Sequence, residues 1–430
     1  MFTERLDFLP DLLALHAARR ADFPYLLMSS GEQGWDMLFA AQSTTLYHAG
    51  EGEAFVEALR QFQPQVVDNP HRLPFVGGHF LYLGYDLLSQ FESRVAEALP
   101  DSFPLAAMAR VPAAILINRR EQSAWIVAES AADWQRLGEL ARSIPAFVPQ
   151  AVNLQALEED PPHWYTDAVV RLKNYIYEGD VFQVNISRGW RAELGTEVQA
   201  PDLFAALRRA NPAPFSALAD FGSAQIVSSS PERLLRVRDG WADTRPIAGT
   251  HPRSPDPAED AALKQRLISS VKERAEHVML IDLERNDLGR ISQPGTVEVN
   301  ELMAVESYAY VHHIESNIRG RLRDDVSPLD TIRALFPGGT ITGCPKVRTM
   351  QIIRELENSA RRAYTGSLGY LNRDGSMDLN ILIRTFMQEG QQLRFRAGGG
   401  IVADSDPQRE LQETRHKARG LLRALGVEQA

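Results

Sequence analysis

The stretch KERAEHVMLIDLERND, residues 272–287, predicts a helix whose apolar face carries a carboxylate. At 3.6 residues per turn, Glu276 falls in line with Met279, Leu280 and Leu283 on one side of that helix. A carboxylate on an apolar stripe costs free energy unless a cation, a hydrogen-bond donor or a metal ion receives it. The stretch therefore predicts a functional site as well as a helix, with pairing to a buried arginine as the alternative.

A second helix, predicted over residues 407–425, repeats this arrangement near the C-terminus. Glu410, Glu413 and Lys417 form one stripe along it, beside a separate apolar stripe. Two or three converging carboxylates are typical of a hard divalent cation such as Mg²⁺ rather than of zinc or iron. A solvated face is the alternative for this helix, and the occurrence of both stripes in one chain favours a metal site.

The composition is that of an ordinary globular protein with a large core. The chain has 430 residues, of which 44% are hydrophobic and 24% charged, enough for two or three domains or one large α/β sandwich. A net charge of −10 without a cluster of Lys and Arg argues against nucleic acid and anionic membranes as partners. The single cysteine, the absence of a signal peptide pattern and the absence of a long apolar run together predict a cytoplasmic protein.

The order of the predicted elements favours an α+β fold. Short strands and helices alternate unevenly before residue 150, and a stretch with several prolines at 145–162 predicts a linker. Further strands are predicted beyond it, including 381–387 and 393–398. Regular βαβ alternation is not seen, so a mostly antiparallel sandwich is favoured over a doubly wound sheet. We divide the chain into an N-terminal region, 1–150, and a catalytic region, 160–426.

The segment FPGGTITGCPK, residues 336–346, leads into a helix predicted at 347–357. Cys344 and Pro345 stand where a phosphate-binding P-loop requires Lys and Ser or Thr, so ATP or GTP binding is rejected. What remains is a helix N-terminus with Lys346 beside it, which suits a carboxylate as well as a phosphate.

Two other glycine-containing turns are predicted, one at Gly398–Gly400 and one at Gly249. Each turn alone is typical of plain chain reversal. The three turns and their cationic residues together predict a pocket for a small dianion. The cationic residues are Lys346, Arg384 and Lys417.

Nucleophilic and zinc sites find little support in the sequence. Cys344 is predicted at a helix N-terminus, which lowers the pKa of a thiol, but no histidine is tied to it by sequence spacing. His312 and His313 are adjacent and lack the cysteine or spaced histidine that a zinc site requires. Neighbouring strand positions point to opposite faces, so a single histidine that acts as an acid or base is the better hypothesis.

Many ordered blocks between residues 164 and 425 resemble the chorismate-utilising enzymes, in particular the large subunits of aminodeoxychorismate synthase and anthranilate synthase. These blocks are EGDVFQVNISR, SSSPERLLRV, TRPIAGT, KERAEHVMLIDLERNDLGRI, VHHIESNIRG, GGTITGCPKVRTMQIIRELE, GSLGYLNRDGSMDLNILIRT and AGGGIVADSDPQRELQETRHKA. Before residue 150 the resemblance is thinner, with LPFVGGHFLYLGYDL and YLLMSS. It implies an α/β sandwich of two large antiparallel sheets with helices outside and the site between the sheets.

The resemblance also implies a division of roles around chorismate. Glu276 and Glu413 are similar to the family's Mg²⁺ carboxylates, with Glu410 close by, and the metal holds the ring carboxylate. Gly343 and Lys346 match the same carboxylate region. A second group receives the enolpyruvyl carboxylate; it consists of Tyr364, Arg384, Gly398, Gly399, Gly400 and Lys417.

The remaining roles concern bond breaking and the nucleophile. Glu232 resembles the general acid that helps the ring hydroxyl leave, His313 the acid/base histidine, and Thr250 a substrate contact. Gln183 stands where the water-activating relatives have a lysine base, so ammonia is the expected nucleophile. No glutaminase block occurs in the chain, so a separate glutamine amidotransferase subunit is expected to form a heterodimer with it and supply the ammonia.

The blocks NPAPFSA, GGTITGCPK and LPFVGG…GYDL resemble aminodeoxychorismate synthase, which makes 4-amino-4-deoxychorismate for folate. Ala248, however, is the residue of anthranilate synthase component I, because many aminodeoxychorismate synthases carry a nucleophilic lysine there. We expect aminodeoxychorismate synthase activity and keep anthranilate synthase activity as the alternative. A hypothesis of a different kind is that the chain is a non-catalytic paralogue. Residues 25–30, YLLMSS, resemble part of the family's tryptophan pocket, with Ser at its acidic position.

Overall fold

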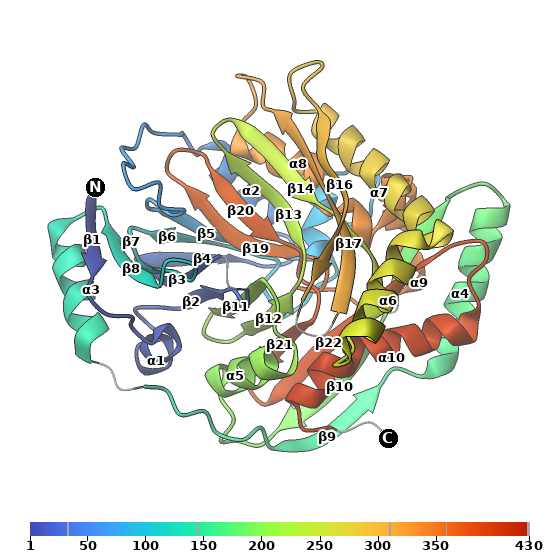
Figure 1. Ribbon diagram of the computed structural model, residues 1–430, viewed down its shortest axis with the longest axis horizontal. Helices are drawn as coiled ribbons and strands as arrows, with labels where there is room; N and C mark the ends of the chain where they lie inside the picture. Colours follow the sequence, from blue (N-terminus) through green and yellow to red (C-terminus); the bar gives the residue numbers. More distant parts are fainter. Residues whose placement is uncertain (32–33, 144–145, 309–310, 358, 428–430) are drawn as a thin grey trace.

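Two antiparallel sheets form the centre of the molecule (Figure 1). The computed structural model describes residues 1–31, 34–143, 146–308, 311–357 and 359–427. Among these residues, twelve strands form the larger sheet. Their order across it is β1 (Phe2–Leu6), β8 (Ser123–Ala128), β7 (Ala113–Asn118), β3 (Trp35–Ala40), β2 (Tyr25–Met28), β11 (Phe215–Asp220), β12 (Gln225–Ser230), β21 (Thr385–Glu389), β22 (Gln392–Ile401), β10 (Gln183–Leu194) and β18 (Gly343–Cys344), with β9 (Leu154–Glu159) beside β10.

The smaller sheet has ten strands within the same described residues. They follow the order β15 (Ile247–Pro252), β17 (Val311–Arg321), β14 (Trp241–Arg245), β13 (Arg233–Arg238), β20 (Met377–Asn380), β19 (Ser367–Asn372), β5 (Gly78–Leu83), β6 (Ala106–Val111) and β4 (Ser43–Tyr47), with β16 (Glu298–Ser307) beside β17.

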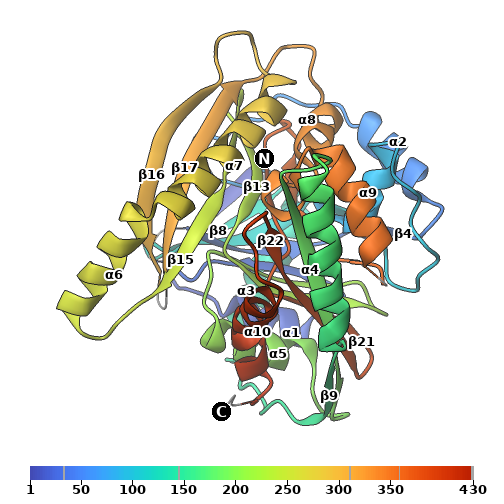
Figure 2. The same ribbon diagram turned by 90° about the vertical axis from the view of Figure 1, so that its right-hand side faces the viewer.

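Helices pack on both sheets (Figures 1 and 2). Against the larger sheet lie α1 (Leu12–Ala18), α3 (Ala131–Ser143), α5 (Ala200–Ala210), α10 (Pro407–Ala424), α4 (Pro162–Tyr177) and α9 (Lys346–Leu356). Against the smaller sheet lie α2 (Gly52–Arg60), α6 (Pro257–Ser269), α7 (Val271–Gly289) and α8 (Pro328–Leu335). Two short 3₁₀ helices are η1 (Tyr85–Gln90) and η2 (Gly339–Ile341).

Aromatic side chains from both sheets fill the layer between them. Tyr25 of β2 and Phe39 of β3 meet Phe80 of β5 there, and the rings of Tyr25 and Phe80 stack with centroids 4.1 Å apart. Alternation along an antiparallel strand sends every second side chain to this inner face, while the other face receives the helices.

The two sequence regions are not separate bodies, because each sheet combines strands from both. In the larger sheet Leu26 of β2 pairs with Leu218 of β11, and in the smaller sheet Leu81 of β5 pairs with Gly369 of β19. The division at residues 150–160 thus remains a division of the sequence. The predicted fold, with two large antiparallel sheets and helices outside, is confirmed.

Three local predictions were wrong. The linker at 145–162 contains β9, an edge strand that pairs with β10, and the strand predicted at 381–387 is interrupted before β21 by Arg384, whose φ is +53°. The turn predicted at Gly398–Gly400 is part of β22, paired with β10. These glycines serve close packing rather than reversal, since a Cβ on Gly398 would lie 2.4 Å from the carbonyl oxygen of Ile186.

Candidate active site

Several buried side-chain atoms without a hydrogen-bond partner gather where α4, β10, η2 and β13 approach one another. An unpaired buried polar atom costs free energy, so a group of such atoms in one place indicates a binding site. The atoms are the hydroxyl of Tyr165, Oε1 of Gln183 and Oδ1 of Asn185. Oε1 of Glu232 and Oγ1 of Thr340 lie in the same place, near enough for Thr340 to act on the Glu232 carboxyl.

Backbone contacts connect these atoms into one region. The side-chain nitrogen Nδ2 of Asn185 donates to the carbonyl oxygen of Thr340 at 3.4 Å. Nε2 of Gln183 lies against Gly400, because a Cβ added there would be only 2.0 Å from it. Gly343, at φ +130°, faces Gln183 from the other side and would bring a Cβ within 2.2 Å of its carbonyl oxygen. Any larger residue at either position would collide with Gln183, so this site requires glycine at both.

Glu232 is the buried acid of the region. It is 5% exposed, and burial raises the pKa of its carboxyl to about 7, against the opposing effects of Thr340 and of the backbone of Ile247. A carboxyl with a pKa near neutrality is divided between its acid and its anion at pH 7 and can deliver a proton there.

His313 lies in β17 opposite the β15 backbone. Its Nδ1 is 3.2 Å from the carbonyl oxygen of Gly249, so this nitrogen carries the proton, and burial lowers the pKa of the ring to about 4. Its neighbour His312 bonds instead to Ser307 and Asp260. The two histidines thus lie in different surroundings, and the His313 ring is a neutral imidazole.

The β15 residues at the site show a β-bulge. The register shifts between Ala248 and Thr250, and Gly249 between them has a φ of +65°. Ala248 is nearly buried, and Thr250 pairs through its backbone with His313 while its side chain lies outside the described part of the structure.

Arg384 and Lys417 form a linked cationic pair. A guanidinium nitrogen of Arg384 donates to the carbonyl oxygen of Lys417. The Lys417 ammonium in turn donates to the carbonyl oxygen of Gly398 at 3.0 Å and lies 2.7 Å from Glu413. Tyr364 is buried close to Arg384, near enough for each to act on the pKa of the other. Two cations and a phenol beside the Gly398 backbone are suitable for an anionic group.

The carboxylates of α7 and α10 approach one another without forming a closed cluster. Glu276 lies 3.7 Å from Lys272, and Glu410 accepts a hydrogen bond from Ser405 at 2.7 Å. Burial raises the pKa of Glu276, and the negative charges of Glu273, Glu413 and Glu410 raise it further. No three His, Cys, Asp or Glu side chains in the described ranges are arranged to hold a metal ion.

These carboxylates nevertheless fit a hard divalent cation. Their charges repel one another across two helices, which a cation between them would relieve. The unpartnered hydroxyl of Tyr165 lies beside them, since it and Glu410 are 3.6 and 3.3 Å from the position of a Cβ on Gly399.

The apolar stripe predicted for α7 was placed one residue out of phase. Glu276 lies at the edge of the buried face of α7, with 34% of its side chain exposed. The buried face of this helix consists of His277, Leu280, Ile281, Glu284, Asp287 and Leu288. The carboxylates in the core are therefore Glu284 and Asp287, which the sequence reasoning missed although the same periodicity contains them.

Lys346 pairs with one of these core carboxylates. Its ammonium lies 2.8 Å from Asp287 and donates to the carbonyl oxygen of Leu335, while Glu284 accepts from the backbone N–H of Gly339 at 3.3 Å. Burial, then the charge of Asp287, raises the pKa of Glu284 to about 8. Burial also raises the pKa of the Cys344 thiol, contrary to the expectation from its helix terminus.

Arg361 is a buried cation that contacts several elements of the site. It is 2% exposed, pairs with Glu357, and donates to the carbonyl oxygens of Asn185 at 2.7 Å and Ile341 at 3.3 Å. Its guanidinium also lies over the rings of Tyr85 and Tyr364. One buried cation therefore contacts β10, η2 and Tyr364 and fixes them relative to one another.

Replacing Arg361 with methionine is expected to lower the free energy of unfolding by about 3 kcal/mol, because the buried Glu357 loses one of its two arginine partners. Urea denaturation measures this change. The control is Arg171→Met, which breaks the exposed pair with Glu355 and is expected to cost less than about 1 kcal/mol. Equal losses in the two variants would contradict the role of Arg361.

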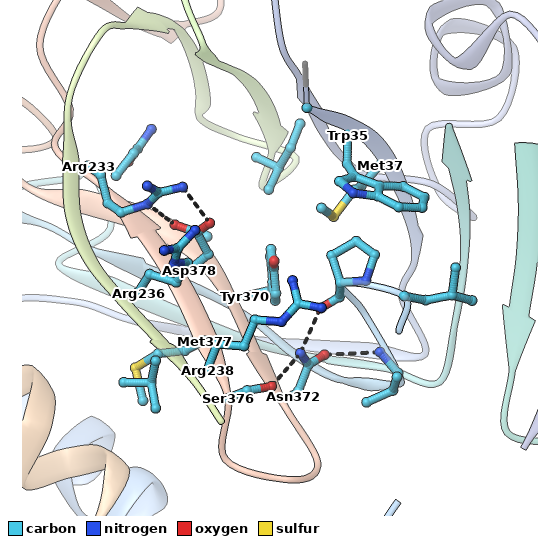
Figure 3. A pocket seen from close by; sticks show the side chains of 18 of the residues that line it. Trp35, Met37, Arg233, Arg236, Arg238, Tyr370, Asn372, Ser376, Met377 and Asp378 are labelled. Atoms are coloured by element: carbon cyan, nitrogen blue, oxygen red, sulfur yellow. Dashed lines mark hydrogen bonds and ion pairs between the residues drawn. The ribbon is translucent and has the colours of Figure 1, made fainter. Parts of the chain in front are cut away.

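A separate cavity of about 650 Å³ opens between β2–β3 and the β13–β20–β19 strands (Figure 3). Leu27, Met28 and Ser29 of the predicted tryptophan-pocket segment line it. Arginines of β13 stand on one wall, Trp35 and Met37 on the facing wall, and Asp378 is held by two nitrogens of Arg233. Glu232 and His313 do not line this cavity, so it is distinct from the site described above.

Comparisons with known proteins agree with this arrangement. The model of a family described as chorismate binding enzyme matches residues 23–423. Anthranilate synthase component 1 of Pseudomonas aeruginosa is 39% identical over 411 residues, covering 89% of this chain and 82% of that protein. Aminodeoxychorismate synthase component 1 of Bacillus subtilis is 38% identical over 402 residues, covering 89% and 85%. The crystal structure of anthranilate synthase component I from Streptococcus pneumoniae has a TM-score of 0.79 and 32% identity, covering 90% of this chain and 91% of that one.

Proposed function

The chain belongs to the chorismate binding enzyme family, and from this premise we propose that it converts chorismate and ammonia to 4-amino-4-deoxychorismate. The observation that carries the choice of ammonia is Gln183. A neutral amide at this position cannot take a proton from water, whereas ammonia has a lone pair available without deprotonation. The relatives named anthranilate synthase and aminodeoxychorismate synthase support an aminating enzyme.

The anionic groups of chorismate account for the cationic side of the site. Arg384 and Lys417, with Tyr364 beside them, receive the enolpyruvyl carboxylate next to the Gly398–Gly400 backbone. Because Asp287 already neutralises Lys346, this lysine supports the wall at Gly343, and the backbone there meets the ring carboxylate.

Glu232 supplies the proton for the departing ring hydroxyl. Loss of hydroxide from the ring is unfavourable, and protonation converts the leaving group to water. The raised pKa keeps enough Glu232 in the acid form at neutral pH. His313, neutral and oriented by Gly249, is placed to move a proton on the ring side.

A magnesium ion is the cofactor that Glu276, Glu413 and Glu410 would hold. When bound, the ion polarises the ring carboxylate and stabilises negative charge that develops in the diene. Lys272 and Lys417, which pair with Glu276 and Glu413 in this structure, balance the same carboxylates.

Ala248 favours a second candidate function, that of anthranilate synthase component I. Alanine carries no amine, so a covalent adduct between enzyme and substrate cannot form at this position, and ammonia or water has to make the first addition at ring C2. If the reaction stopped after ammonia added there, His313 would promote pyruvate loss and yield anthranilate. The C4 hydroxyl leaves as water in this first addition. The blocks around residues 211–217 and 338–346 favour a second addition, of ammonia at C4, which expels the group added at C2.

The product distinguishes the two functions. The purified chain with chorismate, Mg²⁺ and ammonium salt is expected to yield 4-amino-4-deoxychorismate by mass analysis, with no pyruvate released until a separate lyase is added. Stoichiometric pyruvate together with anthranilate fluorescence would replace the first candidate with the second. Absence of any turnover would favour a non-catalytic paralogue.

The same assay tests the partner. Glutamine in place of ammonium is expected to give no product, because a glutamine amidotransferase subunit has to release the ammonia. Turnover should return when that subunit is added, and glutamine-dependent activity of the chain alone would contradict the proposed heterodimer.

A further inference from the structure

We propose that the side-chain amides of Gln183 and Asn185 form the binding site for the ammonia molecule itself. This inference rests on the proposed amination and adds to it a residue, Asn185, and the atoms that hold the nucleophile. The two residues occupy positions i and i+2 of β10, so their side chains leave the same face of the strand about 7 Å apart at their origins.

Each amide is oriented by what its nitrogen contacts. Nδ2 of Asn185 points to the carbonyl oxygen of Thr340, which turns Oδ1 away from that backbone. Nε2 of Gln183 lies over Gly400, where any larger residue would collide with it. The Asn185 amide is therefore oriented by a hydrogen bond of its nitrogen, and the side-chain oxygens of both residues are left for another donor.

Both oxygens are buried and have no hydrogen-bond partner among the described residues. A buried carbonyl oxygen without a donor costs free energy, and two such atoms on one strand face add to that cost unless a ligand donates to them. Gly343 and Gly400 carry no side chains that would displace Gln183, whose carbonyl oxygen and Nε2 lie 2.2 and 2.0 Å from where Cβ atoms on these glycines would be.

Ammonia matches this pair of acceptors in number and charge. It has three N–H donors and one lone pair, so two carbonyl oxygens hold two N–H groups and leave the lone pair free for the substrate ring. A carboxylate in this place would bind the ammonium ion more strongly than ammonia. The acceptors here are neutral amides, which give ammonium less of this advantage. Glu232, the nearby acid, remains available for the leaving group.

The test compares two variants that have nearly the same shape. Asn185→Val removes the oxygen, whereas Asn185→Thr keeps one in a side chain of equal size. With ammonium salt as the nitrogen source, Asn185→Val is expected to raise the KM for ammonia roughly three- to tenfold. The KM for chorismate and the product should stay unchanged, and Asn185→Thr should lie closer to the wild type.

A control comes from the other end of the same strand pair. Gln391, in the turn between β21 and β22, also has a buried unpartnered Oε1 but stands apart from the site. Gln391→Leu is expected to leave the KM for ammonia as it is. Gln183→Leu should raise it as Asn185→Val does, which provides a second variant if one of them fails to fold.

Two results would overturn the inference: an unchanged KM for ammonia in both Asn185→Val and Gln183→Leu, or an equal rise in the KM for chorismate. A wild-type enzyme that forms no aminated product with ammonium would instead refute the proposed function. The wild-type assay thus distinguishes failure of the proposed amination from failure of the proposed ammonia site.

Discussion

Replacing Glu232 with glutamine is expected to lower kcat by about 10²- to 10⁴-fold while the protein stays folded. Glutamine has the shape of the protonated acid but cannot give up a proton, so the ring hydroxyl must leave unassisted. In the wild type the acid form of Glu232 predominates below a pKa of about 7 and is lost as the pH rises through that value. At saturating ammonia, kcat is therefore expected to fall above about pH 7, and Glu232→Gln should lack this decline.

Glu284→Gln is the control for this experiment. Glu284 is also a buried carboxyl with a raised pKa, but it accepts a hydrogen bond from the backbone N–H of Gly339, and burial and the charge of Asp287 raise its pKa more than the charge of Glu232 does. This variant should keep the decline in kcat above pH 7. If Glu232→Gln retained that decline with wild-type kcat, the assignment of the general acid would be wrong.

Replacing Glu276 with glutamine is expected to reduce turnover by at least roughly 100-fold and to weaken Mg²⁺ binding by a similar factor. The substitution preserves shape but removes one of the negative charges that converge from α7 and α10. Titration calorimetry with MgCl₂ measures the binding separately from activity, and wild-type turnover should vanish in excess EDTA.

Asp282→Asn serves as the matched control, because it removes a carboxylate from the same helix on its exposed face, where it pairs with Arg285. It should leave both Mg²⁺ affinity and turnover as they are. Full wild-type activity in excess EDTA, or equal effects of the two variants, would exclude the proposed cation site.

The sequence predicted the sandwich of two antiparallel sheets and the family, but not the phase of α7. Residues 278–281 are all apolar and residue 283 is too, so two neighbouring stripes fit the period of 3.6 equally well. Only the contacts of α7 with β15 and β17 decide that Glu284 faces the core and Glu276 the margin. The helix of residues 407–424 has a single apolar stripe, and its predicted members Leu411, Ala418 and Leu422 are buried, while Lys417 pairs with Glu413 beside it.

The glycine-rich segment shows a second limit. A run of three glycines has no side chains from which strand alternation is visible, so the sequence predicts a turn where β22 in fact continues. Asn185 and Tyr165 were missed for another reason. Both are ordinary residues of a strand and a helix, and only the surrounding structure shows that their polar atoms lack partners.

The mixing of early and late strands in both sheets has a consequence for synthesis on the ribosome. Strand β10 ends at residue 194, and its neighbour β22 begins at residue 392, so roughly 200 further residues have to be made before the pair can close. At ~5–20 residues per second this takes ~10–40 s, during which apolar strand edges of the nascent chain stay open. We therefore expect that ribosome-bound fragments ending before residue 392 need a chaperone to stay free of aggregates, and that a native core resists proteolysis only once β22 has emerged.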